Sequence, residues 1–287
     1  KNVTDGVDEY DYKLVKVDNI TGREAEKMIN DDKHDKDLII FCGVKFMAES
    51  AKILSPHKKV LIPSNETTCP MADMALVDRL ENLMDKHPNA KVVSYINSNL
   101  DIKALSDVCV TSSSAIDILN NLDTEEIIFL PDRNLGSYLQ EQLPNKNFTL
   151  YQGFCPTHER IEKEEIIELK KEYPDYLILV HPECNKDVRD LADFIGSTSE
   201  LINYSASSSS NGFIVVTEEG VLYEMKLKSP TKTFITTKTG MICPNMKKIS
   251  LNDLYNCLKN EEFEVHIDEE LRVKAHKALE NMHLLSV

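Results

Sequence analysis

The sequence predicts an α/β protein with parallel sheets, composed of three related units. Short apolar runs alternate with amphipathic segments along most of the 287 residues, which is typical of strands joined by helices in parallel sheets. A Cys-Pro pair also follows an apolar run three times, at Cys69, Cys155 and Cys243. These cysteines lie 86 and 88 residues apart, so the spacing indicates a repeat of roughly 85–90 residues that delivers one cysteine per copy.

The first unit is predicted to span residues 1–88. It opens with a possible strand at Tyr12–Val17 and a helix at Thr21–Asn30, where Thr21 and Glu24 form a capping box. Asp37–Cys42 is a short continuous apolar run, as expected of a buried parallel strand. The remaining elements are a helix at Phe46–Leu54, a strand at Lys59–Ile62 and one long helix at Met71–His87, ended by Pro88.

The second unit is predicted to span residues 89–173, and the third residues 174–287. Each contains four strands separated by helices. In the second unit the strands are Lys91–Ile96, Val108–Thr111, Glu126–Leu130 and Phe148–Tyr151, and the helices are Asn97–Ser106, Ser113–Leu122, Asn134–Gln142 and Ile161–Tyr173. In the third unit the strands are Tyr176–Val180, Asp193–Ile195, Gly212–Val216 and Thr233–Thr236, and the helices are Asn185–Leu191, Ser199–Tyr204, Glu218–Lys226 and a closing helix at Asp268–His283.

Polar side chains follow corresponding strands in the second and third units. The interval from Tyr95 to Thr111 in the second unit nearly equals the interval from His181 to Thr198 in the third. Parallel sheets bind ligands at the carboxyl ends of their strands, so we expect these loops to display the functional residues. The candidates in these loops are Tyr95, Asn97, Ser112, His181, Glu183, Ser197 and Thr198.

The composition excludes several classes of function. With 33 Lys and Arg against 48 Asp and Glu, the net charge of −15 argues against a nucleic-acid partner, because phosphate binding needs clustered cations. No apolar run approaches the roughly 18–20 residues of a membrane span, and no signal-peptide pattern opens the chain. We therefore expect no membrane association and a cytoplasmic location.

The seven cysteines are odd in number and form no tight disulfide pattern, which favours a reducing compartment. Cys42, Cys109 and Cys257 are expected to pack in the core. The three Cys-Pro thiolates suit either zinc with a bound water or a four-iron four-sulfur cluster with one non-cysteine iron. The lack of Cys-x2-Cys pairs favours the cluster, and three inert cysteines remain the other alternative.

These loops permit definite chemistry around such a group. An iron without a cysteine ligand has an open position and can act as a Lewis acid, which fits a dehydration. His181 and Glu183 are suited to general acid–base work. Ser112, Ser197 and Thr198 stand at predicted helix N-termini, where a carboxylate or phosphate binds favourably.

Several motifs resemble the quinolinate synthase family from about Asp37 to the C-terminus. They are Phe41-Cys-Gly-Val-Lys-Phe-Met-Ala-Glu-Ser-Ala-Lys-Ile-Leu-Ser-Pro56, Val60-Leu-Ile-Pro63, Cys69-Pro-Met-Ala-Asp73, Tyr95-Ile-Asn97-Ser98, Thr111-Ser112, His181-Pro-Glu-Cys184, Gly196-Ser-Thr198 and Cys243-Pro-Asn-Met246. The resemblance implies three pseudo-threefold-related three-layer domains, arranged as a triangle around a central cavity with a [4Fe-4S] cluster. It also implies condensation of iminoaspartate with dihydroxyacetone phosphate to quinolinate in NAD biosynthesis, with loss of water and phosphate.

The resemblance assigns roles by position. Cys69, Cys155 and Cys243 would ligate the cluster. Glu183 would transfer protons, His181 would orient a substrate oxygen, and Tyr95 would complete the catalytic group. Asn97, Ser112, Ser197 and Thr198 would bind substrate. A handoff from the enzyme that produces iminoaspartate is a possible further partnership.

The first unit departs from the family pattern. Family members open with a strand that ends in a His-x-Tyr type loop, and a Gly-Asp-Ser turn follows at an interval like that between the loops of the other two units. Here Thr21-Gly22 stands near the place of that serine, and no histidine precedes His34. Either the opening strand is missing or the first copy has diverged. The alternatives to an active synthase are a catalytically impaired iron–sulfur or small-ligand-binding relative and, as a third, a zinc hydrolase.

Overall fold

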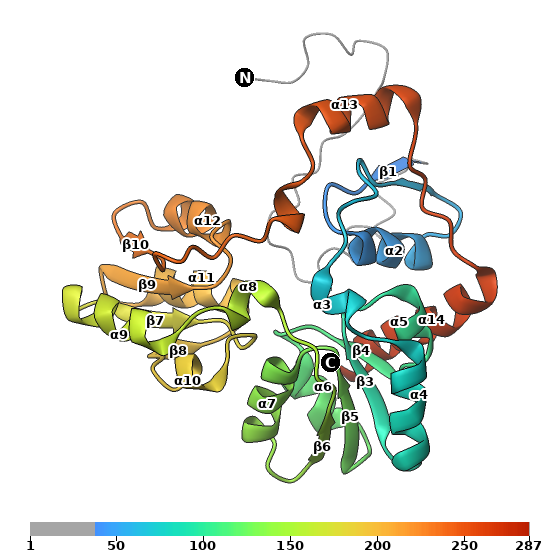
Figure 1. The fold of residues 1–287 in the computed structure, drawn as a ribbon, viewed down its shortest axis with the longest axis horizontal. Helices are drawn as coiled ribbons and strands as arrows, with labels where there is room; N and C mark the ends of the chain where they lie inside the picture. The colour runs from blue at the N-terminus through green and yellow to red at the C-terminus, as the bar shows by residue number, and fades with distance from the viewer. Residues whose placement is uncertain (1–37, 287) are drawn as a thin grey trace.

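The computed structural model describes residues 38–286, in which three separate parallel sheets are each accompanied by helices (Figure 1). The predicted strand at Tyr12–Val17 and the predicted helix at Thr21–Asn30 lie outside the described residues. So does the segment in which the family's His-x-Tyr loop was expected. The α/β class and the parallel sheets predicted from the sequence are confirmed.

The first sheet has two described strands, β1 (Leu38–Ile40) and β2 (Lys59–Leu61), which run parallel. Helix α2 (Lys45–Leu54) connects them and buries its apolar face in the core. A segment far along the chain extends this sheet, because the Val265 amide donates to the Val60 carbonyl at 2.8 Å. The first sheet is therefore completed by residues from near the C-terminal end of the described chain.

The middle sheet has the strand order β4-β3-β5-β6. Its strands are β3 (Lys91–Tyr95), β4 (Val108–Val110), β5 (Glu126–Leu130) and β6 (Asn147–Leu150). The accompanying helices are α5 (Leu100–Ala104), α6 (Ala115–Asn121) and α7 (Arg133–Gln142). Four of the five residues of β5 are buried, which explains why its sequence is an almost continuous apolar run.

The third sheet has the order β10-β9-β7-β8. Its strands are β7 (Leu177–Val180), β8 (Phe194–Ile195), β9 (Gly212–Val216) and β10 (Thr233–Ile235). Its helices are α9 (Lys163–Glu172), α10 (Lys186–Arg189), α11 (Thr198–Ser207) and α12 (Val221–Lys228). In both four-stranded sheets the first strand pairs with the second and third, and the third pairs with the fourth. This shared topology agrees with the repeat read from the second and third units.

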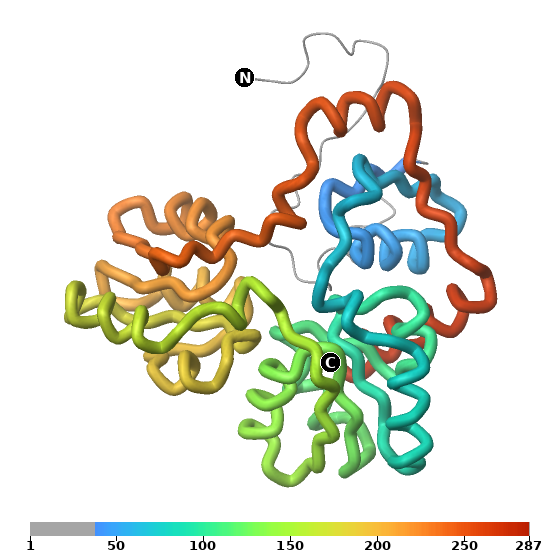
Figure 2. Tube along the Cα trace, viewed as in Figure 1, coloured from blue at the N-terminus to red at the C-terminus, as the bar shows by residue number. Residues whose placement is uncertain are grey.

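After β10 the chain passes a short 3₁₀ turn, η1 (Asn245–Lys247), and crosses to the first sheet through α13 (Leu251–Asn260). It then runs to α14 (Glu269–Leu285) beside the middle sheet (Figure 2). The sequence pattern predicts α14 but not α13. Ala275, Ala278, Leu279 and Met282 of α14 join the same core cluster as β4. No helix within residues 38–286 is both long and apolar enough to cross a bilayer.

The predicted single helix Met71–His87 is wrong. The structure has two helices instead, α3 (Pro70–Asp73) and α4 (Val77–Lys86). The Tyr151 hydroxyl enters the break between them, donating to the Met74 carbonyl at 2.9 Å and accepting from the Leu76 amide at 3.1 Å. Backbone groups that a continuous helix would pair internally are bonded instead to a side chain of the second unit.

The prediction that Cys42, Cys109 and Cys257 all pack in the core is wrong for one of them. Cys109 and Cys257 are buried, but Cys42 is exposed. It lies just beyond β1, where the chain has left the sheet and turns toward α2.

Candidate functional site

The candidate site forms where loops from the middle and third sheets meet. Tyr95 is the last residue of β3, and Glu183 lies in the loop after β7. The Tyr95 hydroxyl donates a 2.8 Å hydrogen bond to Oε1 of Glu183, and the Ser112 side chain hydrogen-bonds the same hydroxyl. Burial raises the pKa of Tyr95 well above its ordinary value, and the charge of Glu183 adds to this. Tyr95 therefore stays protonated and acts as a donor.

A histidine from a third loop completes this group. His158 lies in the short helix α8 (Pro156–Glu159), directly after Cys155. Its Nδ1 is 3.1 Å from Oε2 of Glu183 and 3.2 Å from Sγ of Cys155. Its Nε2 is 3.0 Å from Oγ1 of Thr217, and its ring stacks on His181 with 5.0 Å between centroids. His158 thus connects the carboxylate, a loop cysteine and the third sheet.

The pKa values of Glu183 and His181 indicate that the group contains one anion and one neutral base at neutral pH. Burial by itself would raise the pKa of Glu183, but His158, His181 and the Tyr95 hydrogen bond outweigh it and lower that pKa to about 2. Burial lowers the pKa of His181 to about 4; the charge of Glu183 opposes this shift, and the neighbouring His158 adds to it. At neutral pH Glu183 is therefore a carboxylate and His181 a neutral imidazole. Neighbouring titratable groups with such separated pKa values are characteristic of acid–base sites.

Asp132 fixes the backbone behind this group. It is fully buried and follows β5. Its Oδ1 accepts from the amides of Asn134 and Leu135 at the start of α7, and its Oδ2 accepts from the Cys155 amide at 3.2 Å. Burial raises the pKa of Asp132 well above its ordinary value, and the nearby charge of Glu183 contributes. One side chain thus joins the start of α7 to the second cysteine loop.

We refer to residues 62–76, 151–160 and 236–247 as the Cys69, Cys155 and Cys243 loops. The Cys155 loop is bonded to both of the others. Tyr151, at its start, bonds Met74 of the Cys69 loop, as described above. Arg160, at its end, donates through Nη2 to the Ile242 carbonyl of the Cys243 loop at 3.0 Å. The middle loop of the three is therefore held at both ends.

A third contact closes the ring. Asn245 of the Cys243 loop donates through Nδ2 to the Thr68 carbonyl, next to Cys69, at 2.7 Å. Each pair of cysteine loops is thus joined by one long-range side chain, although the bonded residues are widely separated in the sequence. The charges of Cys243 and Glu183 each raise the pKa of Cys69, in agreement with the proximity of these groups.

The residues present fit a thiolate-bound metal group. Cys69, Cys155 and Cys243 are free thiols of intermediate exposure. Burial raises the pKa of Cys69 to about 12 and that of Cys155 well above its ordinary value. A thiolate in such a place is stabilised by a bound cation, because the positive charge compensates for the hydration that burial removes. Sulfur ligands of this kind suit iron–sulfur clusters or zinc.

A smaller set of ligand atoms lies within this group. One atom each from Cys155, His158 and Glu183 lies within 4.8 Å of the others, a spacing that would also suit a single metal ion. Both the cluster and the zinc alternatives therefore remain compatible with the donor set.

The predicted site residues divide into two groups. The structure brings together Tyr95, Ser112, His181, Glu183 and the three loop cysteines, as described above. Asn97 lies in the loop after β3, and Ser197 and Thr198 stand at the start of α11. Within the part of the chain that is described, these three form no hydrogen bond with that group. The Ser197 hydroxyl oxygen accepts from the Glu200 amide in a capping box, so its role in this structure is to cap α11.

Sequence reasoning left His158 without a role and missed Asp132 and Thr217. A signal for His158 is its position shortly after Cys155, which lets both side chains face the same side of the first turn of α8. Thr217 follows β9 directly, at the carboxyl end where ligands are expected. Asp132 follows β5 in the same way.

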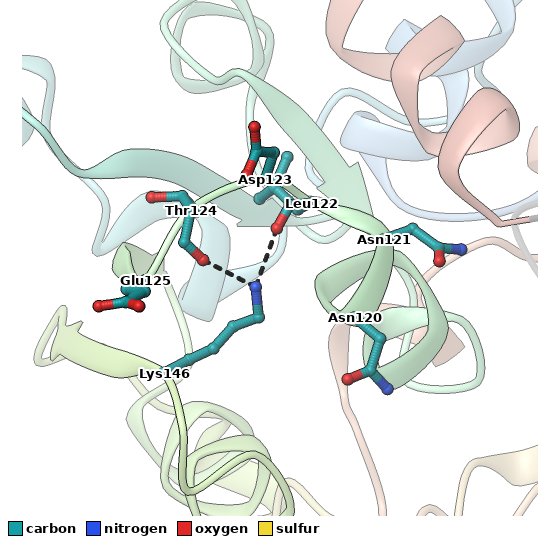
Figure 3. A pocket seen from close by; sticks show the side chains of 7 residues that line it. All are labelled: Asn120, Asn121, Leu122, Asp123, Thr124, Glu125 and Lys146. Atoms are coloured by element: carbon teal, nitrogen blue, oxygen red, sulfur yellow. Dashed lines mark hydrogen bonds between the residues drawn. The ribbon is translucent and has the colours of Figure 1, made fainter.

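A polar depression lies at the opposite end of the middle sheet (Figure 3). Its residues precede β5 and β6, whereas Tyr95 and Asp132 follow β3 and β5. Lys146 donates there to the carbonyls of Leu122 and Thr124 at 2.9 and 2.7 Å. These bonds tie together two loops at the amino ends of the strands, so we regard the depression as structural.

Comparison with known proteins agrees with this geometry. The family described as "Quinolinate synthetase A protein" matches residues 11–284. A quinolinate synthase of Clostridium perfringens is 56% identical over 251 residues, which cover 88% of this chain and 83% of that protein. Quinolinate synthases of Clostridium acetobutylicum and Clostridioides difficile are 55% and 51% identical, each over 88% of this chain and over 84% and 83% of their own lengths. By the extent of these matches, the chain belongs to the quinolinate synthase A family.

Proposed function

We propose that this chain is a quinolinate synthase that condenses iminoaspartate with dihydroxyacetone phosphate, with loss of water and phosphate. The observation that carries the proposal is the 56% identity over 88% of the chain with a quinolinate synthase. The buried group of Tyr95, His158, His181 and Glu183 supports it, since the reaction requires repeated proton transfers. No observation favours a catalytically impaired relative or a zinc hydrolase.

Glu183 is the proposed proton acceptor. Its carboxylate is held between the Tyr95 hydroxyl on Oε1 and His158 on Oε2. His158 holds Oε2 of Glu183 in place through Nδ1, and its Nε2 faces Thr217 on the other side of the ring. His181, neutral at pH 7, is suited to hydrogen-bond a substrate oxygen rather than to attract an anion by charge.

Substrate binding is assigned to side chains at the adjoining strand ends. Ser112 and Asn97 follow β4 and β3, and Ser197 and Thr198 open α11. The N-terminus of this ten-residue helix favours a negative group, so the carboxylates or the phosphate are the substrate groups we place there. The Ser197 hydroxyl can still donate to a ligand while its oxygen accepts from Glu200.

We further propose that Cys69, Cys155 and Cys243 hold a [4Fe-4S] cluster. When bound, the cluster would supply a Lewis-acidic iron without a cysteine ligand, suited to assist the loss of a hydroxyl group. The ring of contacts through Tyr151, Arg160 and Asn245 supports the proposal, because it keeps three loops from distant parts of the chain together.

We also propose the triangular arrangement of three pseudo-threefold-related domains, with boundaries near residues 88 and 173. The equivalent strand orders of the two four-stranded sheets support this proposal. Cytoplasmic location, NAD biosynthesis as the pathway and transfer of iminoaspartate from its producing enzyme belong to the same proposal. The odd number of free cysteines supports a reducing compartment.

The direct test is anaerobic incubation of the iron- and sulfide-loaded protein with iminoaspartate and dihydroxyacetone phosphate. We expect quinolinate to form, together with one phosphate per quinolinate. Protein that carries about four iron and four sulfide per chain but forms no quinolinate would rule out the synthase and leave the impaired relative. Zinc in place of iron would rule out the cluster.

A further inference from the structure

The loop that carries Glu183 is held from behind by two buried side chains. The carboxylate of Glu183 meets Tyr95, as described above, but its backbone is fixed by a different set of contacts. Nδ2 of Asn134 donates to the Glu183 carbonyl at 3.1 Å. Nε of Arg189 donates to the next carbonyl, that of Cys184, at 3.1 Å. Two successive peptide groups thus each accept from a side chain.

Both donors are anchored to helix α7. Asn134 lies in its first turn, and its Nδ2 also donates to Oε2 of Glu159 at 2.7 Å. Arg189 comes from α10 in the third sheet, but its guanidinium reaches across to α7. Its Nη1 and Nη2 donate to the two oxygens of Glu141 at 3.2 and 3.3 Å, and Nη2 also donates to Ser137. Arg189 is 2% exposed and Asn134 is 7% exposed, so their bonds to the Glu183 and Cys184 carbonyls are shielded from water, whereas the Glu141 end of the network is 37% exposed.

This arrangement matters because the partners of Glu183 belong to two different sheets. Tyr95 ends β3 of the middle sheet, whereas Glu183 follows β7 of the third sheet. Helix α7 leaves β5 of the middle sheet, directly next to β3. A link from α7 to the Glu183 backbone therefore sets the separation between the Tyr95 hydroxyl and the Glu183 carboxylate.

We propose that Asn134 and Arg189 are positioning residues, which lock the backbone of the Glu183 loop against α7 and thereby set the Tyr95–Glu183 hydrogen bond. The proposal rests on the proposed function in so far as Glu183 transfers protons in that reaction. Neither side chain bonds the Glu183 carboxylate, so their effect on the reaction is indirect.

The test uses Arg189→Met, which keeps an unbranched apolar stem but removes every donor. Displacing a reacting group by about 1 Å can cost about 100-fold in rate, so we expect kcat to fall by about that factor while KM changes little. Iron and sulfide content are expected to match the parent protein. Arg189→Lys should recover only part of kcat, because lysine lacks the fork that reaches Glu141 and Cys184 together. Arg79→Met is the matched control, since it makes the same substitution at an exposed position of α4, away from Glu141.

A double-mutant cycle separates positioning from general stability. If Arg189 acts through the Tyr95–Glu183 pair, Arg189→Met should cost far less in a Tyr95→Phe background than in the parent. Equal losses in both backgrounds would overturn the proposal. Asn134→Ala provides the same cycle if Arg189→Met does not fold.

A structural readout distinguishes failure of this proposal from failure of the proposed function. In a crystal structure of Arg189→Met or Asn134→Ala, the Tyr95–Glu183 separation should exceed hydrogen-bonding distance, compared with 2.8 Å here. An unchanged separation would overturn the positioning proposal even if the parent protein makes quinolinate. If the separation is longer in the variants and the parent protein makes no quinolinate, the positioning role is upheld while the synthase assignment fails.

Discussion

The hydroxyl of Tyr95 and the carboxylate of Glu183 are joined by a 2.8 Å hydrogen bond between two sheets, although the residues are 88 positions apart in the chain. Both side chains are buried. A charge-assisted bond in such a place is stronger than one between neutral groups, and breaking it leaves the Oε1 atom of Glu183 without its Tyr95 donor.

Tyr95→Phe tests this bond directly. The ring still fills its place in the core, but Glu183 loses one donor, so we expect kcat for quinolinate formation to fall about 10²-fold with little change in iron content. Tyr255→Phe is the control, because Tyr255 is exposed on α13. Steady-state kinetics under anaerobic conditions provide the measurement. A Tyr95→Phe enzyme with parental kcat would show that the bond has no part in the reaction.

Cys155→Ala and Cys257→Ala are expected to differ in metal content. Cys155 belongs to the three-loop group, whereas Cys257 is buried in α13 and donates to the Glu262 carbonyl at 3.4 Å. After anaerobic reconstitution, the first variant should lack the visible absorption of the proposed cluster and most of the iron, and the second should have both. Equal iron and sulfide loading in the two proteins would contradict the ligand assignment.

Arg160→Met and Asn245→Ala are expected to speed loss of the proposed cluster without removing a proposed ligand. Each substitution breaks one contact between two cysteine loops. The half-time of iron release to a chelator should shorten several-fold in each variant. Arg79→Met and Asn252→Ala are matched controls at exposed helical positions. If both ring variants release iron at the parental rate, the contacts do not stabilise the metal-bound state.

Lys103→Met is expected to destabilise the fold. Lys103 is fully buried, and its Nζ donates to the carbonyls of Ser98 at 2.6 Å and Phe46 at 3.4 Å, joining the loop after β3 to α2. Removing this donor leaves buried acceptors without it, at a cost of about 1–3 kcal/mol. Urea unfolding measures the change, with Lys86→Met as the exposed control. An unchanged midpoint would show that water or other donors replace the ammonium.

The same lysine predicts a pH dependence of stability. Burial lowers the pKa of Lys103 from 10.5 in the folded protein, with the charges of Cys109 and Glu49 opposing this in part. Between the lowered pKa and 10.5 the unfolded chain binds more protons, so stability rises with pH across that window. The parent should therefore gain free energy of unfolding relative to Lys103→Met as the pH approaches 10.5. A constant difference would contradict the lowered pKa.

Strands were the most predictable part of this protein. Buried parallel strands such as Gly212–Val216 and Glu126–Leu130 read as continuous apolar runs between polar loops, and both have the predicted bounds. The break in Met71–His87 was not predictable, because it depends on the hydroxyl of Tyr151, which is far from this segment in the sequence. The local sequence favours a helix through residues 74–76 and gives no indication of the contact with Tyr151.

The candidate site shows the same division. The sequence pattern locates the ends of the strands, where side chains can reach a ligand. This was enough to predict that Tyr95, Ser112, His181 and Glu183 lie at the site. The contact of His158 with Glu183 depends on how the Cys155 loop crosses between sheets, which spacing alone does not determine. Asp132 and Arg189 were missed for a similar reason, since each acts on backbone groups of another loop.

The packing of α14 has a consequence for how the chain folds during synthesis. This helix supplies Ala275, Ala278, Leu279 and Met282 to the core of β4 and α6, and Asn281 bonds the Asp107 carbonyl from 174 residues away. The middle sheet therefore emerges from the ribosome well before the helix that covers it. Until α14 is made, the apolar surface around β4 stays open to solvent and to chaperones. Contacts of such long sequence separation also slow folding, so completion of this core is a late event.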